Sequence, residues 1–230
     1  MSSSERTAKQ AHDENVAVMG QEVGAIYSAL WQEVALIYQK WGQFVELFGT
    51  SPERVDLLNK AAPALFRTAQ DSLWGDLLLH LARLTDPPRS AGKSNLSLQR
   101  LQKTLIGSPV ESGVEASTSK AVTATAFARD WRNRKLAHRD LDLALGQHVM
   151  PLVPASRIAV KEALSAVADV LNVVAGHYRV PTTTFDLSGA TVDAASLLYT
   201  LRDGLRYAEE RRMRLKSGTY TQDDFRPERI

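Results

Sequence analysis

Apolar residues recur at helical spacing along most of the chain. The longest stripe advances in steps of three or four residues and consists of Val16, Met19, Val23, Ile26, Leu30, Val34, Ile37, Trp41, Phe44 and Phe48. Such spacing gathers the apolar side chains on one face, so it predicts a long amphipathic helix. Gly20 and Gly24 lie within the stripe, where each either weakens the helix by roughly 1 kcal/mol or lets another helix approach closely.

Further stripes predict further helices, separated by segments that contain Pro and Gly. These helices are expected over residues 52–85, with a break near Ala61 caused by Pro63, then from residue 95, and over 114–135, 156–176 and 192–215. Residues 180–187 are the best strand candidate, but the segment is short. The pattern therefore predicts an all-α fold, an antiparallel up-and-down helical bundle with additional helices.

The length of 230 residues predicts a single domain over residues 1–230. Within this domain, residues 190–216 are expected to form an added C-terminal helix. The two ends of the chain, about residues 1–12 and 217–230, are polar and are expected to be flexible, because they carry few apolar side chains to bury.

Composition narrows the functional classes. The chain lacks cysteine, which excludes disulfides, zinc-thiolate sites, iron–sulfur clusters and thiol nucleophiles. The histidines are scattered without a second ligand at metal spacing, so neither a metal site nor a cofactor is predicted. No apolar run approaches the roughly 20 residues that span a bilayer, and no signal-peptide pattern opens the chain. We therefore expect a cytoplasmic protein without membrane association.

One segment stands apart in charge, although the net charge of +2 does not by itself indicate a nucleic-acid partner. Residues 129–140 contain five Arg or Lys and two Asp, a local charge of +3. The simplest interpretation is a solvated, basic helix end. Periodicity argues against it, because Trp131 continues the apolar face, Lys135 occupies the next position and the apolar Leu136 comes one place late. The helix is therefore expected to end or bulge between Trp131 and Leu136.

Arg132 and His138 accompany this irregularity. They are six residues apart, about 240° around an ideal helix, and so do not share a face. They can converge if the backbone departs from an ideal helix, if the long side chain of Arg132 reaches round, or if a second subunit contributes another copy. Each of these alternatives describes a built site better than a plain surface.

Arg132-Asn133 followed by His138 resembles the R-x(4–6)-H motif of the HEPN superfamily, the higher eukaryotes and prokaryotes nucleotide-binding domains. The surrounding residues 132–140 look most like the branch associated with bacterial abortive infection, type U. Two further stretches are also similar to this branch, residues 81–87 and 95–98.

The resemblance covers about residues 19–176 and implies a helical bundle, usually a homodimer. For many members it also implies metal-independent ribonuclease activity, in phage defence or another stress response, with Arg and His at the dimer interface. Arg132, His138 and Asn133 are then the catalytic candidates, with His138 transferring a proton and Arg132 stabilising the charge on phosphate. Their basic neighbours are expected to bind RNA phosphates, namely Arg134, Lys135 and Arg139.

Two alternatives stay open. Some toxin members carry a Tyr two residues after the His, the target of a partner nucleotidyltransferase, but here that position is Asp140, which leaves an antitoxin partner unresolved. The chain can also be a non-catalytic HEPN-like module that binds nucleotide, RNA or a protein. The presence of both Arg132 and His138 favours the ribonuclease. His80 lies on an apolar face and is interpreted as a core histidine.

Overall fold

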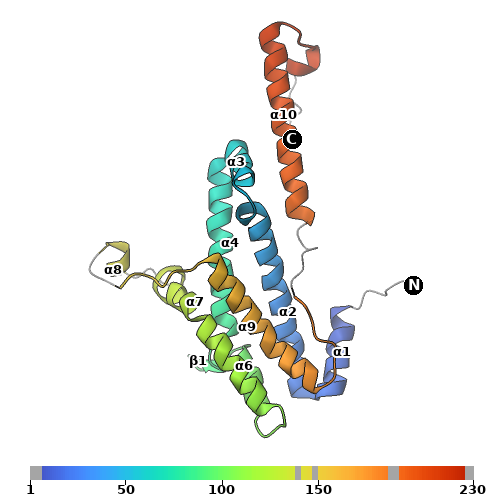
Figure 1. Ribbon diagram of the computed structural model, residues 1–230, viewed down its shortest axis with the longest axis vertical. Coiled ribbons are helices and arrows are strands. Elements are labelled where there is room, and N and C mark those ends of the chain that lie inside the picture. The colour runs from blue at the N-terminus through green and yellow to red at the C-terminus, as the bar shows by residue number, and fades with distance from the viewer. Residues whose placement is uncertain (1–6, 138–140, 147–149, 186–191, 226–230) are drawn as a thin grey trace. The chain divides into compact units, whose positions relative to one another are not determined.

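The computed structural model describes residues 7–137, 141–146, 150–185 and 192–225 of the chain (Figure 1). His138, Arg139 and Asp140 lie outside the described residues. The described residues form ten α-helices, and their only sheet is an antiparallel hairpin of β1 (Arg89–Ser90) and β2 (Lys93–Ser94). The all-α prediction is therefore confirmed. No helix in the described ranges combines the length and the apolar character needed to cross a bilayer.

Contacts within the chain define two compact units. Unit 1 contains residues 1–41 and 73–187, and unit 2 contains residues 42–72 and 188–230. Two long helices, α2 (Gln21–Phe44) and α4 (Pro63–Leu84), each contribute one part to both units. The single domain stays a prediction, because this division describes contacts and not independent folding.

The first predicted helix is in fact two helices. α1 (Ala8–Met19) begins earlier than predicted, since the side chain of Thr7 caps its first turn. Gly20 then adopts a φ of 83°, which ends α1 before α2 begins. Gly24 lets the two helices approach closely, because a Cβ at this position would lie 2.5 Å from the carbonyl oxygen of Asn15. This contact confirms the close-approach interpretation of Gly24.

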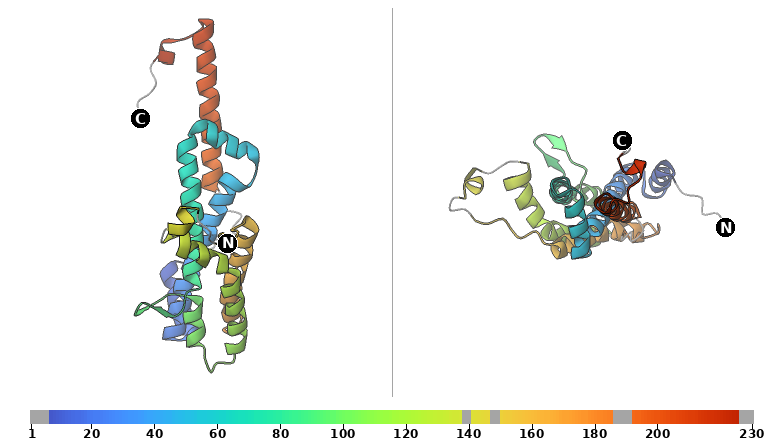
Figure 2. Two further views of the ribbon diagram at one scale, coloured as in Figure 1. Left: turned by 90° about the vertical axis from the view of Figure 1, so that its left-hand side faces the viewer. Right: turned by 90° about the horizontal axis from the view of Figure 1, so that it is seen from above.

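The core of unit 1 joins α2 and α4 to three further helices, α5 (Leu98–Thr104), α6 (Glu111–Ala124) and α9 (Arg157–His177). α6 packs along α9, and the two helices lie side by side in the views of Figures 1 and 2. Fully buried apolar side chains of this core include Leu30, Leu77, Leu81, Leu101, Val114, Leu164 and Leu171. Each such side chain contributes roughly 1.5–3 kcal/mol through burial, so packing holds the helices that carry the candidate site.

Unit 2 contains a π-helical turn (Val45–Gly49), α3 (Pro52–Ala61), α10 (Val192–Ser217) and a 3-10 turn (Gln222–Phe225). α3 ends two residues before Pro63, which begins α4 and so confirms the predicted break. α10 packs against α3 and against the π-helical turn, and Leu198 of α10 is buried.

The chain after α10 turns back onto that helix, and we call residues 211–225 the C-terminal hook. The side chain of Arg214 pairs with the carboxylate of Asp224 at 2.6 Å, and the backbone N–H of Thr221 donates to the same carboxylate at 2.9 Å. Arg211 donates to the carbonyl oxygen of Asp224. The hydrogen bonds from Arg214 and Thr221 lower the pKa of Asp224 to about 2. The hook is therefore closed by one buried, fully engaged carboxylate.

Candidate functional site

The candidate site begins where a helix widens. After α7 (Ala126–Trp131), residues 132–136 form a π-helical turn, in which the N–H of Ala137 donates to the carbonyl oxygen of Arg132 at 2.9 Å. The extra residue in this turn moves the apolar position from Lys135 to Leu136, whose side chain lies against Gly75 of α4. The bulge predicted between Trp131 and Leu136 is therefore confirmed.

The widened turn presents Arg132 to the end of α4. Its Nη1 donates to Oδ1 of Asp86 at 2.6 Å, and its Nε donates to Oδ1 of Asn133 at 3.0 Å. The side chains of Arg132 and Asp86 are 23% and 19% exposed, so this ion pair is only partly in contact with solvent. Because Arg132 carries five N–H donors, these two bonds position the guanidinium without using its whole donor set.

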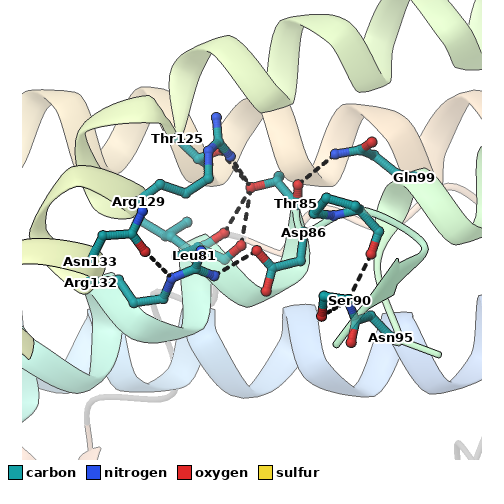
Figure 3. Close-up of polar contacts among 12 residues, drawn as sticks. Leu81, Thr85, Asp86, Ser90, Asn95, Gln99, Thr125, Arg129, Arg132 and Asn133 are labelled. Atoms are coloured by element: carbon teal, nitrogen blue, oxygen red, sulfur yellow. Dashed lines mark hydrogen bonds and ion pairs between the residues drawn. The ribbon is translucent and has the colours of Figure 1, made fainter. Parts of the chain in front are cut away.

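A second arginine lies one helical turn before Arg132. Nη1 of Arg129 donates to the hydroxyls of Thr85 and Thr125 at 2.7 and 3.0 Å, and its Nη2 donates to the carbonyl oxygen of Val122. Burial lowers the pKa of Arg129, the carboxylate of Asp86 opposes this shift, and the charge of Arg132 adds to it. Figure 3 shows both guanidinium groups directed toward the Thr85–Asp86 end of α4.

The three stretches that resemble the HEPN branch come together at this point. Residues 81–87 supply Thr85 and Asp86, and residues 132–133 supply the arginine and asparagine that face them. Asn95 supports the intervening hairpin, since its Nδ2 donates at 2.8 Å to the carbonyl oxygen of Pro87 and at 2.8 Å to the hydroxyl of Ser90. Segments more than forty residues apart in the sequence thus form one polar cluster.

The model of one family, described as AbiU2 within the HEPN domains, matches residues 20–189. The chain belongs to the AbiU2 family of HEPN domains. The resemblance found in the sequence is confirmed, and the protein is an abortive-infection-related HEPN domain. The match ends before α10, so this helix lies beyond the family's common region. No curated protein and no solved structure matches the chain.

The other predicted residues of this AbiU2 domain lie in different environments. Arg134 pairs with Asp130 at 3.4 Å and donates to the carbonyl oxygen of Met150. Lys135 is exposed, and its ammonium lies 4.6 Å from the centre of the Trp131 ring. Arg134 thus fastens the chain near residue 150, whereas Lys135 remains on the surface.

The remaining predicted residues, His138 and Arg139, lie outside the described residues, as does Asp140. The convergence of Arg132 and His138, and the contact of Arg139 with RNA, therefore stay predictions. In the described part of the AbiU2 domain, no three His, Asp or Glu side chains are grouped to hold a metal ion.

Sequence reasoning missed Asp86, Thr85, Thr125 and Arg129 as members of the cluster. Arg129 was part of the basic segment, and Asp86 was part of a stretch similar to the family, but neither signal assigned a contact. The sequence does not indicate a distant partner for the hydroxyl of Thr125, because a threonine near a helix end can hydrogen-bond several nearby backbone groups.

His80 of the AbiU2 domain lies apart from this cluster and faces α2. Its Nε2 is 2.8 Å from Oε2 of Glu33, and its Nδ1 has no hydrogen-bond partner among the described residues. Burial lowers the pKa of His80, which outweighs the opposing effect of the Glu33 carboxylate. The side chain is 1% exposed in the core, consistent with the interpretation of a core histidine.

Proposed function

We propose that this AbiU2-family protein is a metal-independent endoribonuclease that acts as a homodimer in an abortive-infection response. The observation that carries the proposal is the position of Arg132, which a π-helical turn presents and which Asp86 and Asn133 orient. A partly exposed guanidinium with donors to spare is suited to a phosphate, since its planar fork matches two phosphate oxygens.

The proposed reaction uses the RNA itself as the nucleophile. The 2′-hydroxyl attacks the adjacent phosphorus as the bond to the 5′-oxygen breaks, leaving a 2′,3′-cyclic phosphate and a 5′-hydroxyl. One group accepts the proton of the 2′-hydroxyl, and another donates a proton to the departing 5′-oxygen. His138 is suited to either role, because an unperturbed imidazole titrates near pH 6.5. Arg132 stabilises the charge that develops on the phosphate.

The two proton transfers call for a homodimer, and exposed apolar side chains of this protein support one. A single His138 does not readily reach both sides of the phosphorus, whereas two copies related by a two-fold axis divide the roles. Large apolar side chains are exposed in the segment after the motif: Leu141, Leu145, Met150, Val153 and Ile158. Exposed apolar residues concentrated in one segment favour its burial against a second copy.

The test is cleavage of total RNA by the purified full-length chain in the presence of EDTA. We expect cleavage that does not need metal and that falls by about 10² or more in Arg132→Ala and His138→Ala. Lys135→Ala is the matched control, because it removes a charge from the same π-helical turn without touching Asp86, and it should lower cleavage by no more than about threefold. Absence of cleavage by the wild-type chain, or wild-type cleavage by His138→Ala, would falsify the catalytic proposal.

The second candidate is a non-catalytic HEPN module that binds RNA through the same surface. The ion pair between Arg132 and Asp86 favours it, since an arginine engaged by a carboxylate can serve architecture alone. This module would bind RNA without cleaving it, and His138→Ala would bind as tightly as the wild type.

A further inference from the structure

Two threonine hydroxyls form the buried centre of the polar cluster. Thr85 directly follows the last residue of α4, and Thr125 lies between α6 and α7. Their Oγ1 atoms are 2.7 Å apart, and the two residues are 1% and 0% exposed. The hydroxyl of Thr125 also donates to the carbonyl oxygen of Ala121 at 2.9 Å. The hydroxyl pair therefore joins the end of α4 to the junction of α6 and α7.

Arg129 closes this pair from one side. Its Nη1 carries two hydrogens, so it can donate one to each hydroxyl while Thr125 donates onward to Ala121. The hydrogen bonds of the Arg129 guanidinium go to uncharged acceptors, the two hydroxyls and the carbonyl oxygen of Val122. A partly buried charge whose hydrogen bonds go to neutral acceptors is costly, and the carboxylate of Asp86 offsets part of this cost.

The placement of this charge links it to the candidate catalytic arginine. Asp86 follows Thr85 directly, so any contact that holds Thr85 also sets the origin of the Asp86 side chain. The side-chain amide of Gln99 also fixes the position of Thr85, since its Nε2 donates at 2.8 Å to the carbonyl oxygen of Thr85. Asp86 in turn binds Arg132 at 2.6 Å (Figure 3). One connected set of contacts thus runs from Arg129 to Arg132.

We propose that Arg129, locked by the hydroxyls of Thr85 and Thr125, is a positioning residue that fixes Asp86 and through it the guanidinium of Arg132. The catalytic part of this inference rests on the proposed function, whereas the effect on the orientation of Arg132 does not. Arg129 touches no substrate in this scheme. It acts by limiting the positions that the phosphate-binding side chain can adopt, and small misplacements of such groups are costly for catalysis.

The test replaces both hydroxyls with methyl groups of similar shape, in the variant Thr85→Val/Thr125→Val of the full-length chain. The matched control is Thr118→Val, because Thr118 is buried on α6 and its hydroxyl has no partner among the described residues. The measurement is the ¹H–¹⁵N signal of the arginine Nε–H groups, with the Arg132 signal identified by its loss in Arg132→Lys.

We expect the Arg132 signal to move and its hydrogen to exchange with solvent about tenfold or more faster in the double variant, because a guanidinium that Asp86 no longer holds also loses the hydrogen bond from its Nε–H to Asn133. Thr118→Val should leave the Arg132 signal unchanged. An unchanged Arg132 signal in the folded double variant overturns the proposal. If the double variant lacks the helical circular dichroism of the wild type, Thr125→Val alone is measured, and an unchanged signal there overturns the proposal in the same way.

Kinetics separate this inference from the proposed function. Where the wild type cleaves RNA, the valine variants should lose about tenfold or more in kcat. KM should change little, because the protein keeps its other contacts with the phosphates of the RNA. A wild-type chain that does not cleave RNA defeats the ribonuclease proposal and leaves the positioning of Arg132 to be judged by its Nε–H signal. A rise in KM alone, with kcat unchanged, contradicts a positioning role for Arg129.

Discussion

Two clusters in this molecule are built from the same parts, two arginines and one aspartate, and use them differently. In the C-terminal hook of unit 2, the carboxylate of Asp224 accepts from Arg214 and from Thr221, and it is almost completely buried. In unit 1, Asp86 accepts a hydrogen bond from Arg132, the only one it accepts from a described residue. The first aspartate closes a loop, and the second orients one arginine.

The difference lies in how fully each carboxylate is engaged. Several donors stabilise the ionised form of Asp224, which lowers its pKa to about 2. Asp86 holds Arg132 through a single strong contact that leaves guanidinium donors for another oxyanion.

The largest expected effect tests whether Arg132 and Arg214 differ in function. Arg132→Lys keeps the positive charge but loses the planar fork, so we expect cleavage to fall by about 10² or more. Arg214→Lys makes the same change in the hook and should leave cleavage within about twofold of the wild type. Initial rates on one RNA substrate in EDTA provide the measurement. Equal losses in the two variants would contradict the distinction.

The next largest effect tests whether Asp86 and Asp224 have different roles. Asp86→Asn removes the charge that orients Arg132, and we expect about a tenfold loss in kcat. Asp224→Asn should spare cleavage but open the hook, so limited proteolysis should cut faster within residues 217–225. Mapping the cut sites by mass spectrometry checks the second outcome. A hook that stays protected in Asp224→Asn would show that the carboxylate does not close it.

A third prediction concerns pH. Because burial lowers the pKa of His80, the unfolded chain binds more protons than the folded chain below about pH 6.5, and the free energy of unfolding should fall as pH decreases through this range. Each unit of pKa difference corresponds to about 1.4 kcal/mol. Urea unfolding at several pH values provides the measurement, and His80→Gln should flatten the dependence.

The same variant separates His80 from the proposed catalytic histidine. If His138 sets the pH profile of cleavage, His80→Gln should keep that profile while losing the pH dependence of stability. A cleavage profile that shifts with His80→Gln would assign the profile to folding and not to catalysis.

The smallest expected effect concerns the exposed cation beside the site. Lys135→Ala should weaken RNA binding about two- to threefold and reduce its salt dependence, because it removes one phosphate contact. Arg134→Ala should instead loosen the chain near residue 150, since Arg134 bonds Asp130 and the carbonyl oxygen of Met150. Binding isotherms at two salt concentrations distinguish a lost phosphate contact from a loosened segment.

Periodicity in the sequence accounts for much of what the fold shows. It predicted the all-α class and the bulge between Trp131 and Leu136, while Pro63 predicted the helix break and close approach was one of two interpretations of Gly24. These features are local, and a regular spacing of apolar residues reports them because a helix must keep its apolar face toward the core. The same rule missed the break at Gly20, since the apolar stripe continues across it and only the backbone φ reveals the turn.

The sequence by itself thus determined the all-α class, the family and the identity of Arg132 as a candidate, but not every helix boundary, since the helix predicted over residues 114–135 is α6, α7 and a π-helical turn. Only the tertiary structure decided that Arg132 meets Asp86, 46 residues away, and that Arg129 meets Thr85, 44 residues away. It also decided that Arg134 is engaged by Asp130 and Met150 while Lys135 is exposed. Spacing along one helix states which face a side chain occupies, but its partner depends on how distant helices pack and on the rotamer that this packing allows.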